Sequence, residues 1–168
     1  YFDGVVTDKG VADAAIDDDL KETIIGALDK VQAKMADLKV ADALTEIFAI
    51  FKRCNKYIDE TEPWVLAKDE AKADRLATVM YNLVEGITIG ASLLQPFMPE
   101  TAEKIVAQLN TQVRDFEVLK QFGLRENGLK VTEKPEILFA RLDVKEVVEK
   151  AEAMFAEREK SKEPAEPV

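Results

Sequence analysis

Residues 54–68 bring together side chains that could bind an unpaired nucleobase. The segment contains the only tryptophan of the chain, Trp64, directly after Pro63, and it carries Lys56 and Lys68 on either side of this pair. Because the proline ring fixes φ, a stiff backbone rather than a mobile loop aims the indole ring. Stacking on such a ring contributes roughly 1–3 kcal/mol per base, and neighbouring cations support the phosphate. The spacing therefore indicates single-stranded nucleic acid as one class of ligand.

A purely structural interpretation of the same segment stays open. In this interpretation Trp64 fills the end of a helical bundle, and Asn55 caps the C-terminal end of the preceding helix. The two interpretations differ in one observable property. A stacking platform needs one ring face open to solvent with Lys56 or Lys68 near it, whereas a packing role buries the ring.

The composition excludes most catalytic and metal sites. The chain has no histidine, which removes imidazole as general base, nucleophile activator and metal ligand. A single cysteine cannot form an internal disulfide or a multi-thiolate zinc site. Phosphate-binding and dinucleotide-binding glycine motifs and the nucleophile elbow are absent from the sequence. We expect no catalytic residue and no metal site, and we interpret four glutamates as solvated faces or helix caps: Glu46, Glu60, Glu62 and Glu85.

The charge distribution still permits a nucleic-acid partner. The formal net charge is −10 at pH 7, and such acidity usually argues against nucleic acid. Six aspartates lie within residues 1–19 and seven glutamates within residues 144–168, so the 124 residues between these ends carry a net charge of only −3. A local basic or aromatic surface on the body of the protein is therefore allowed.

The cysteine content and the hydropathy pattern bear on location. One cysteine and no signal-like N-terminus predict a reducing, cytoplasmic setting. The longest run without a charged residue, residues 86–99, has 14 residues, which is fewer than the roughly 20 needed to cross a bilayer. We therefore expect no membrane partner.

The spacing of apolar residues predicts helices through most of the chain. The aspartate run 17–19 is interpreted as the N-cap of the first helix. Pro96 ends the third helix, and Pro99 suits the first turn of the fourth. Asp143 and Glu146 form a capping box for the last helix. The predicted helices cover residues 20–38, 40–57, 74–94, Pro99 to Leu109 and 144–159, with one or two short turns within 115–122.

Several residues predict how these helices pack. Gly86 and Gly90 stand in the third helix, where each costs about 1 kcal/mol relative to Ala, so we interpret them as positions of close helix approach. Arg53 and Lys56 fall outside the apolar stripe of the second helix. Residues 127–142 leave the helical pattern through an Asn-Gly turn. Four antiparallel helices and a return helix make an all-α helical bundle.

Three ordered motifs resemble one known domain. Asn55 to Lys68, with the pattern Asn-Lys-Tyr-Ile-Asp-Glu-Thr-x-Pro-Trp-Val-Leu-Ala-Lys, closely resembles the anticodon-binding helical domain of methionyl-tRNA synthetase. Residues 94–102 (Leu-Gln-Pro-Phe-Met-Pro-Glu-Thr-Ala) are similar to a helix junction of that domain, and residues 135–143 (Pro-x-Ile-Leu-Phe-x-Arg-Leu-Asp) resemble its closing segment. Residues 1–4, Tyr-Phe-Asp-Gly, also resemble the end of its first helix.

The resemblance implies a role for each residue of the first motif. It implies the anticodon-binding bundle of a class I aminoacyl-tRNA synthetase, in its full form an ATP-dependent methionine–tRNA ligase. In this family Trp64 would stack on a base of the CAU anticodon, and Pro63 would position it. Asn55 and Lys56 are further anticodon-binding candidates, although a capping role fits Asn55 equally well.

The resemblance also implies parts that lie outside the chain. The HIGH and KMSKS motifs of the catalytic domain do not occur in this sequence, so we expect the chain alone to be inactive and to bind no cofactor, with ATP bound in the catalytic domain. The family's other anticodon-reading polar and arginine residues lie on a first helix, which here would precede Tyr1. The implied partners are initiator and elongator methionine tRNA, the catalytic domain of the same protein and, through a C-terminal module not present here, a second copy.

The implied organisation is a bundle over residues 1–143 with its first helix truncated at the start, a return helix over 144–159 and a disordered linker over 160–168. In isolation, the apolar stripe of the return helix would be exposed. Two alternatives remain open. One is the anticodon domain of another class I synthetase, which the Pro63–Trp64 pair and the closing segment disfavour. The other is a protein-interaction helical bundle with no RNA role, which would bury Trp64.

Overall fold

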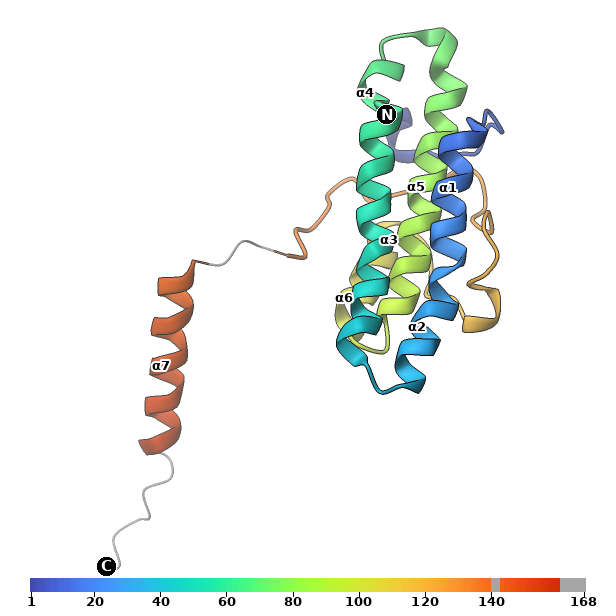
Figure 1. Ribbon diagram of the computed structural model, residues 1–168. Coiled ribbons are helices and arrows are strands. Elements are labelled where there is room, and N and C mark those ends of the chain that lie inside the picture. The colour runs from blue at the N-terminus through green and yellow to red at the C-terminus, as the bar shows by residue number, and fades with distance from the viewer. Residues whose placement is uncertain (140–142, 161–168) are drawn as a thin grey trace, which may run out of the picture. The chain divides into compact units, whose positions relative to one another are not determined.

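Helices account for most of the chain, as the spacing of its apolar residues requires (Figure 1). The computed structural model describes residues 1–139 and 143–160. Residues 1–136 form a first unit, the helical bundle, and a second unit begins at Ile137. The described elements are η1 (Phe2–Gly4), β1 (Val5–Val6), α1 (Ala14–Ile25), α2 (Ala27–Ala36), α3 (Val40–Thr61), α4 (Pro63–Leu66), η2 (Glu70–Lys72), α5 (Ala73–Leu94), α6 (Pro99–Gln108), η3 (Phe116–Val118), β2 (Leu129–Lys130) and α7 (Val144–Lys160), where η denotes a 3-10 helix.

Helix α5 forms the centre of the bundle. Most of its residues from Leu76 to Leu94 are buried, and it contacts α1, α3, α4 and α6. A helix that is apolar on nearly all sides must be covered by other helices. Within the described residues, the segment Glu70–Leu94 is long and apolar enough to cross a membrane, but 89% of its most apolar window is buried inside the protein. Its apolar character is therefore explained by its place in the core.

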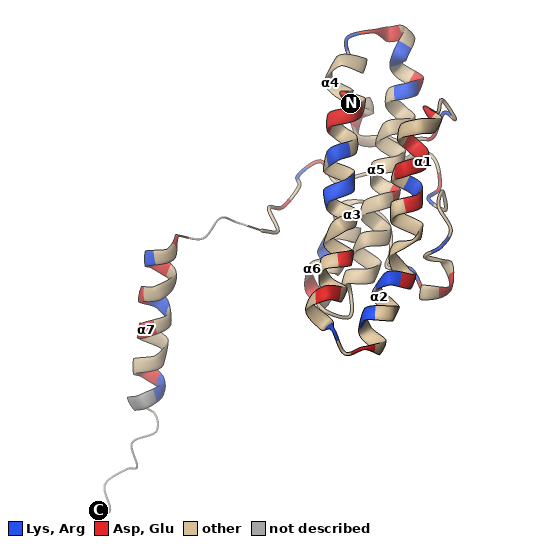
Figure 2. Cartoon of the chain, in the orientation of Figure 1, with Lys and Arg blue, Asp and Glu red and all other residues tan. Residues whose placement is uncertain are grey.

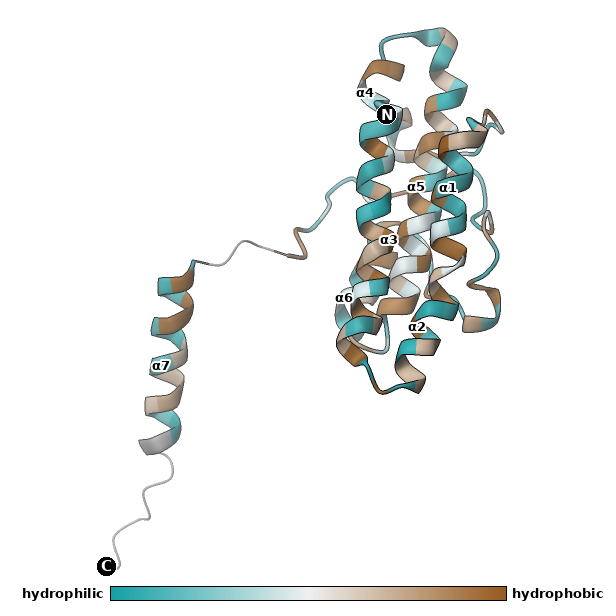
Figure 3. Ribbon diagram, viewed as in Figure 1, coloured by the Kyte–Doolittle hydropathy of each residue, from teal (hydrophilic) through white to brown (hydrophobic). Residues whose placement is uncertain are grey.

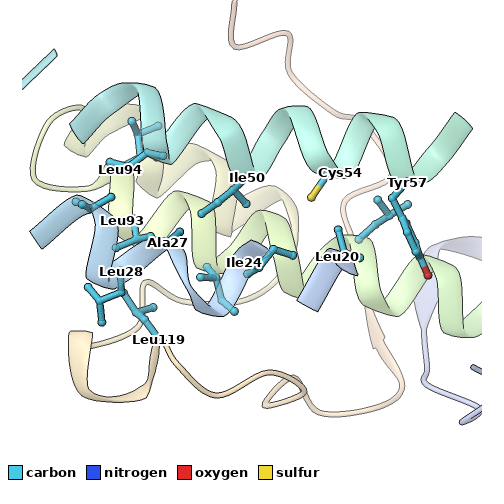
Figure 4. Packing of buried hydrophobic residues seen from close by; sticks show 14 of the residues in the cluster. Leu20, Ile24, Ala27, Leu28, Ile50, Cys54, Tyr57, Leu93, Leu94 and Leu119 are labelled. Carbon is cyan, nitrogen blue, oxygen red and sulfur yellow. The ribbon is translucent and has the colours of Figure 1, made fainter. Parts of the chain in front are cut away.

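Helix α3 buries one side chain per turn against α1 and α5. Ile47, Ile50 and Tyr57 are wholly buried on this face, and the later turns of the helix are largely hydrophilic on their outward side (Figure 3). They meet Leu20 and Ile24 of α1 in one continuous core (Figure 4). Each fully buried Leu or Ile contributes roughly 1.5–3 kcal/mol, so this seam provides much of the stability of the bundle.

Two glycines permit the close packing of α5, as expected. A Cβ atom added at Gly86 would lie 2.7 Å from Cδ1 of Ile24, and one added at Gly90 would lie 2.9 Å from the ring of Phe51. These separations are shorter than van der Waals contact. Helices α1 and α3 therefore approach α5 at distances that a larger residue would prevent.

The prediction of one helix over residues 20–38 is wrong. The segment forms two helices, α1 beginning at Ala14 and α2 ending at Ala36, joined at Gly26. Asp17, which we expected to cap the helix, lies inside α1 and is wholly buried. The Arg75 guanidinium of α5 compensates its charge, and the Tyr57 hydroxyl of α3 donates to it. Local capping rules take no account of such distant partners. The predicted helix 74–94 and the start of the fourth helix at Pro99 are confirmed.

A short antiparallel pairing, which we did not predict, closes one side of the bundle. Val5 of β1 faces Lys130 of β2 in this register. The predicted Asn-Gly turn precedes β2, and Gly128 adopts φ +83°, a conformation that glycine reaches without steric cost. Within residues 1–4, Phe2–Gly4 form the 3-10 helix η1 leading into β1, rather than the end of an α-helix.

The second unit consists, in its described part, of a short segment and helix α7. The Asp143 carboxylate accepts hydrogen bonds from the backbone N–H groups of Lys145 (2.8 Å) and Glu146 (3.4 Å), as expected for an N-cap. The apolar residues Val144 and Phe155 are 75% and 66% exposed. Residues 161–168 of the predicted linker, and positions 140–142 of the closing motif with Arg141, lie outside the described residues.

Candidate nucleic-acid interface

Trp64 follows the end of α3 on a short helix that the backbone orients firmly. Helix α3 ends at Thr61, four residues beyond its predicted end. Glu62 then adopts a left-handed conformation (φ 45°, ψ 59°), which turns the chain. Pro63 occupies the first position of α4 and is buried. Because the fixed φ of proline suits the first helical turn, Pro63 anchors α4 and holds the backbone of Trp64 in place.

Trp64 is 46% exposed. Asn55 and Lys56 are exposed on α3, and Lys68 is exposed just after α4. Figure 2 shows basic residues on the later turns of α3 and in the segment between α4 and α5, at the same end of the bundle. The exposure of Trp64 is what a stacking platform needs, and the burial expected of a residue that merely fills the bundle end is not observed.

Asn55 does not cap a helix. It lies six residues before the last residue of α3, in the helix interior, so the capping interpretation is wrong. Lys56 forms an ion pair with Glu60 one turn later, with 3.1 Å between Nζ and Oε1. Asn55 and Lys56 both lie on the exposed surface of α3. A ligand can therefore reach the Asn55 amide directly, but it must compete with Glu60 for the Lys56 ammonium.

A buried polar cluster joins α1, α3 and α5 beneath the last turns of α3. Asp17 accepts hydrogen bonds from the Tyr57 hydroxyl (2.7 Å) and from both terminal guanidinium nitrogens of Arg75 (2.7 and 2.8 Å). Nδ2 of Asn82 donates to the Tyr57 oxygen (3.0 Å). Burial acts to raise the pKa of Asp17, but the hydrogen bonds from Arg75 and Tyr57 outweigh it and lower that pKa. Burial and Asp17 raise the pKa of Tyr57, so its hydroxyl keeps the proton it donates.

Arg53 reinforces the same junction from inside the protein. We expected it to point away from the bundle, but it is only 8% exposed. Its Nε donates to Asp19 (2.6 Å), its Nη2 donates to the Ile16 carbonyl (3.2 Å), and its Nη1 lies 3.0 Å from Glu60. The long aliphatic stem of arginine can lie against apolar surface while its head reaches charged partners, so an apolar-stripe argument misplaces it.

A surface hollow of about 640 Å³ lies beside this cluster. Leu66, two residues after Trp64, forms part of its wall, so the hollow is at the Trp64 end of the bundle. Acidic and basic side chains both line it, and its charge alone selects no class of ligand. The lining residues come from α1, α3, α4, η2 and α5 and the segment before α1: Ala12, Asp13, Ala14, Ile16, Glu60, Thr61, Leu66, Lys72 and Arg75.

Glu85 is a second buried carboxylate, and its interpretation as a solvated or capping residue is wrong. It is wholly buried and accepts hydrogen bonds from the guanidinium of Arg114. It also accepts from the backbone N–H groups of Gly123 (2.7 Å), Leu124 (3.0 Å) and Arg125 (3.0 Å). Glu85 thereby fixes the loop after α6. A single acid in an otherwise apolar stretch of α5 was the sequence signal for this role.

The single cysteine of the chain lies in the core. Burial raises the pKa of the Cys54 thiol to about 11, so the thiol stays protonated and unreactive at neutral pH. Among residues 1–139 and 143–160, no group of three or more His, Cys, Asp and Glu side chains is placed to hold a metal ion. At this end of the bundle the structure presents an exposed tryptophan, and Asn55, Lys56 and Lys68 are exposed on the neighbouring segments.

Comparison with known proteins identifies the domain type. Residues 7–160 match the family model of the anticodon-binding domain of methionyl tRNA ligase. The methionine–tRNA ligase of Clostridium acetobutylicum is 44% identical over 161 residues, covering 96% of this chain and 25% of the relative. That of Clostridium perfringens is 44% identical over 154 residues, covering 92% and 24%. The chain thus spans about a quarter of the length of these curated relatives.

Solved structures agree with this assignment. The apo form of Mycobacterium tuberculosis methionyl-tRNA synthetase matches with a TM-score of 0.75 at 31% identity, covering 84% of this chain and 29% of that one. The same enzyme in complex with methionyl-adenylate matches with a TM-score of 0.73 at 32% identity, covering 83% and 27%. The predicted all-α helical bundle is confirmed. This chain belongs to the family of anticodon-binding domains of methionyl-tRNA ligases.

Proposed function

We propose that this domain recognises the CAU anticodon of methionine tRNA and that Trp64 is the platform on which one anticodon base stacks. The observation that carries the proposal is a tryptophan that is nearly half exposed although the proline before it is buried. A solvent-facing ring on a rigid backbone costs little conformational entropy to present to a ligand. Family membership supplies the anticodon as the class of RNA.

Recognition would combine stacking with polar contacts. Unpaired bases stack on aromatic side chains, and hydrogen bonds to their Watson–Crick edges discriminate among them. The exposed Asn55 amide can offer both a donor and an acceptor to a base edge, and Lys56 and Lys68 can approach the backbone phosphates as point charges. Because the body of the domain is mildly acidic, we expect only a few phosphate contacts and binding weaker than about micromolar. These contacts still make the affinity fall as the salt concentration rises.

The complete protein is proposed to be an ATP-dependent methionine–tRNA ligase of the cytoplasm. Two relatives named methionine–tRNA ligase match along nearly the whole of this chain. The proposed partners are initiator and elongator methionine tRNA, a catalytic domain in the same polypeptide that binds ATP, and a second copy of the protein joined through a C-terminal module. No step of the aminoacylation chemistry falls on residues of this chain. Anticodon binding here would orient the acceptor end of the tRNA towards that catalytic domain.

The test is a titration of Trp64 fluorescence with a seventeen-nucleotide anticodon stem-loop. Because the chain has one tryptophan, any quenching reports on the ring itself. A CAU loop should quench the fluorescence at low salt, and a GAC loop of the same stem should not. A nanomolar dissociation constant at physiological salt would contradict the expected weak binding.

A substitution separates stacking from general binding. Trp64→Leu should weaken binding of a dye-labelled CAU stem-loop by roughly 5- to 150-fold, which corresponds to the loss of about 1–3 kcal/mol of stacking. Phe116→Leu is the matched control, because Phe116 is also an exposed aromatic residue (51%) but lies on η3. Equal affinity of the Trp64→Leu variant and the original protein would exclude the platform role. Quenching by both loops would indicate RNA binding without anticodon selection.

A further inference from the structure

We infer that Tyr57 is a positioning residue for anticodon binding: its buried hydroxyl fixes the last two turns of α3 on α1 and α5 and thereby sets the orientation of the Trp64 ring. This inference rests on the proposed function of Trp64. It assigns to the polar cluster around Asp17 a role in recognition that goes beyond holding the fold together.

The hydroxyl of Tyr57 is the point at which three helices meet. It donates to Asp17 of α1 at 2.7 Å and accepts from Asn82 of α5 at 3.0 Å. Tyr57 is wholly buried. Asp17 is held in turn by both terminal guanidinium nitrogens of Arg75, so it cannot move without breaking an ion pair. The Tyr57 hydroxyl is therefore held in place by hydrogen bonds to both neighbouring helices.

The connection from Tyr57 to Trp64 contains no flexible segment. The Thr61 hydroxyl donates to the Tyr57 carbonyl (2.7 Å), and the Glu62 backbone N–H donates to the Ile58 carbonyl (3.0 Å). After the left-handed residue Glu62, buried Pro63 begins α4 directly. A displacement of the last turns of α3 would therefore be transmitted to the tryptophan instead of being absorbed.

A small rotation at Tyr57 is enough to matter at the platform. The four helical steps from Tyr57 to Thr61 span roughly 6 Å at 1.5 Å per residue. A tilt of about 10° at the tyrosine would then move the end of α3, and with it the start of the turn to Trp64, by about 1 Å. Misplacement on that scale can cost up to about a hundredfold where function depends on geometry.

The polar character of the junction also favours a positioning role. Well-packed apolar residues in place of a buried ion pair often leave a protein equally or more stable, so such a pair is weak evidence for stability alone. A fully satisfied buried network instead admits one geometry. Here that geometry is imposed at the end of the bundle that presents the aromatic ring, beneath the exposed Asn55 and Lys56.

The experiment compares two tyrosine-to-phenylalanine variants of the 168-residue chain. Tyr57→Phe removes the hydroxyl at the junction. Tyr81→Phe is the matched control, because Tyr81 is also buried and its hydroxyl donates to the Arg125 carbonyl at 2.8 Å, away from the junction. Thermal denaturation first establishes a temperature at which both variants are fully folded. Binding of the CAU stem-loop and time-resolved fluorescence anisotropy of Trp64 without RNA are then measured at that temperature.

We expect Tyr57→Phe to weaken stem-loop binding about five- to tenfold and to widen the motion of the Trp64 ring, while Tyr81→Phe changes both by less than twofold. Equal effects of the two variants, or no change in ring motion in Tyr57→Phe, would overturn the inference. If Tyr57→Phe does not fold, Asn82→Leu replaces it, and we expect a smaller loss of stem-loop affinity and a smaller increase in ring motion. The same two comparisons with Tyr81→Phe then decide the inference. If the original protein binds no stem-loop, the proposed function fails, and the anisotropy comparison still decides whether Tyr57 orients Trp64.

Discussion

Replacing Glu85 with glutamine tests whether a buried carboxylate organises the loop after α6. The carboxylate is fully buried and accepts from Arg114 and from three consecutive backbone N–H groups, residues 123–125. Each of its two oxygens accepts at least two donors. Glutamine has nearly the same shape, but its NH₂ group is a donor. Whichever way the amide is oriented, at least two N–H donors would face another donor.

The expected loss of stability follows from these contacts. Removing one partner of a buried charged pair costs about 3–5 kcal/mol, because the other charge is left uncompensated. In Glu85→Gln the Arg114 guanidinium loses its counter-ion, and backbone donors lose an acceptor they cannot replace with water. We therefore expect the free energy of unfolding to fall by about 3–5 kcal/mol, and the melting temperature to fall by roughly 10–15 °C for a domain of this size.

The assay is urea denaturation followed by circular dichroism at neutral pH, with a thermal scan alongside. Glu103→Gln is the matched control, because Glu103 is exposed on α6 and the same chemical change there should shift the free energy of unfolding by less than about 0.5 kcal/mol. A loss below about 1 kcal/mol in Glu85→Gln would refute the assigned role. It would mean that the loop does not depend on this carboxylate, whatever the hydrogen-bond geometry.

Three further predictions concern the core. Gly86→Ala should destabilise the protein by about 1 kcal/mol in urea, because the clash with Ile24 outweighs the helix propensity that Ala gains; a stabilised variant would contradict the close approach. The pKa of Asp17 is lower in the folded than in the unfolded chain, so its pairing with Arg75 stabilises the fold above about pH 4, and this stabilisation is lost as the pH falls through the folded pKa. Asp17→Asn should be less stable than the original protein at pH 7, and its free energy of unfolding should fall less between pH 5 and pH 2. An unchanged acid dependence would count against the pairing. The Cys54 thiol, with its pKa raised to about 11 by burial, should react with a disulfide reagent at pH 8 only after urea is added, whereas rapid reaction in native buffer would show that it is accessible.

The apolar periodicity predicted helices whose limits are marked by nearby residues, and it failed where partners distant in sequence decide whether a polar side chain is buried. The third and fourth predicted helices agree with α5 and α6 because an apolar stripe and two prolines mark their limits in the sequence. The aspartate run 17–19 resembled a helix cap because the partners of Asp17, on α3 and α5, are distant in sequence. The same reason explains why Arg53 and Glu85 were expected at the surface.

The candidate site was likewise predictable only in part from the sequence. Trp64, Pro63, Asn55 and Lys56 were identified from residue type, spacing and family resemblance, because an aromatic residue after a proline is a local signal. Their roles in RNA binding stay predictions. The polar cluster around Asp17 could not be predicted. In the sequence, Tyr57 looks like any other residue of an apolar helix face and Asn82 like any residue of a mixed face, and only the packing of the helices brings them together.

The sequence by itself determined an all-α bundle, the absence of histidine-dependent chemistry and a rigid aromatic segment that resembles an anticodon-binding motif. Only the tertiary structure decided that Trp64 is open to solvent, that Asp17 and Glu85 are buried, and that residues 5–6 pair with residues 129–130. The physical reason is the distance along the sequence over which each interaction acts. Helix formation and proline geometry depend on neighbours within one or two turns, whereas burial of a charge depends on partners that only the packing of the chain brings within hydrogen-bonding distance.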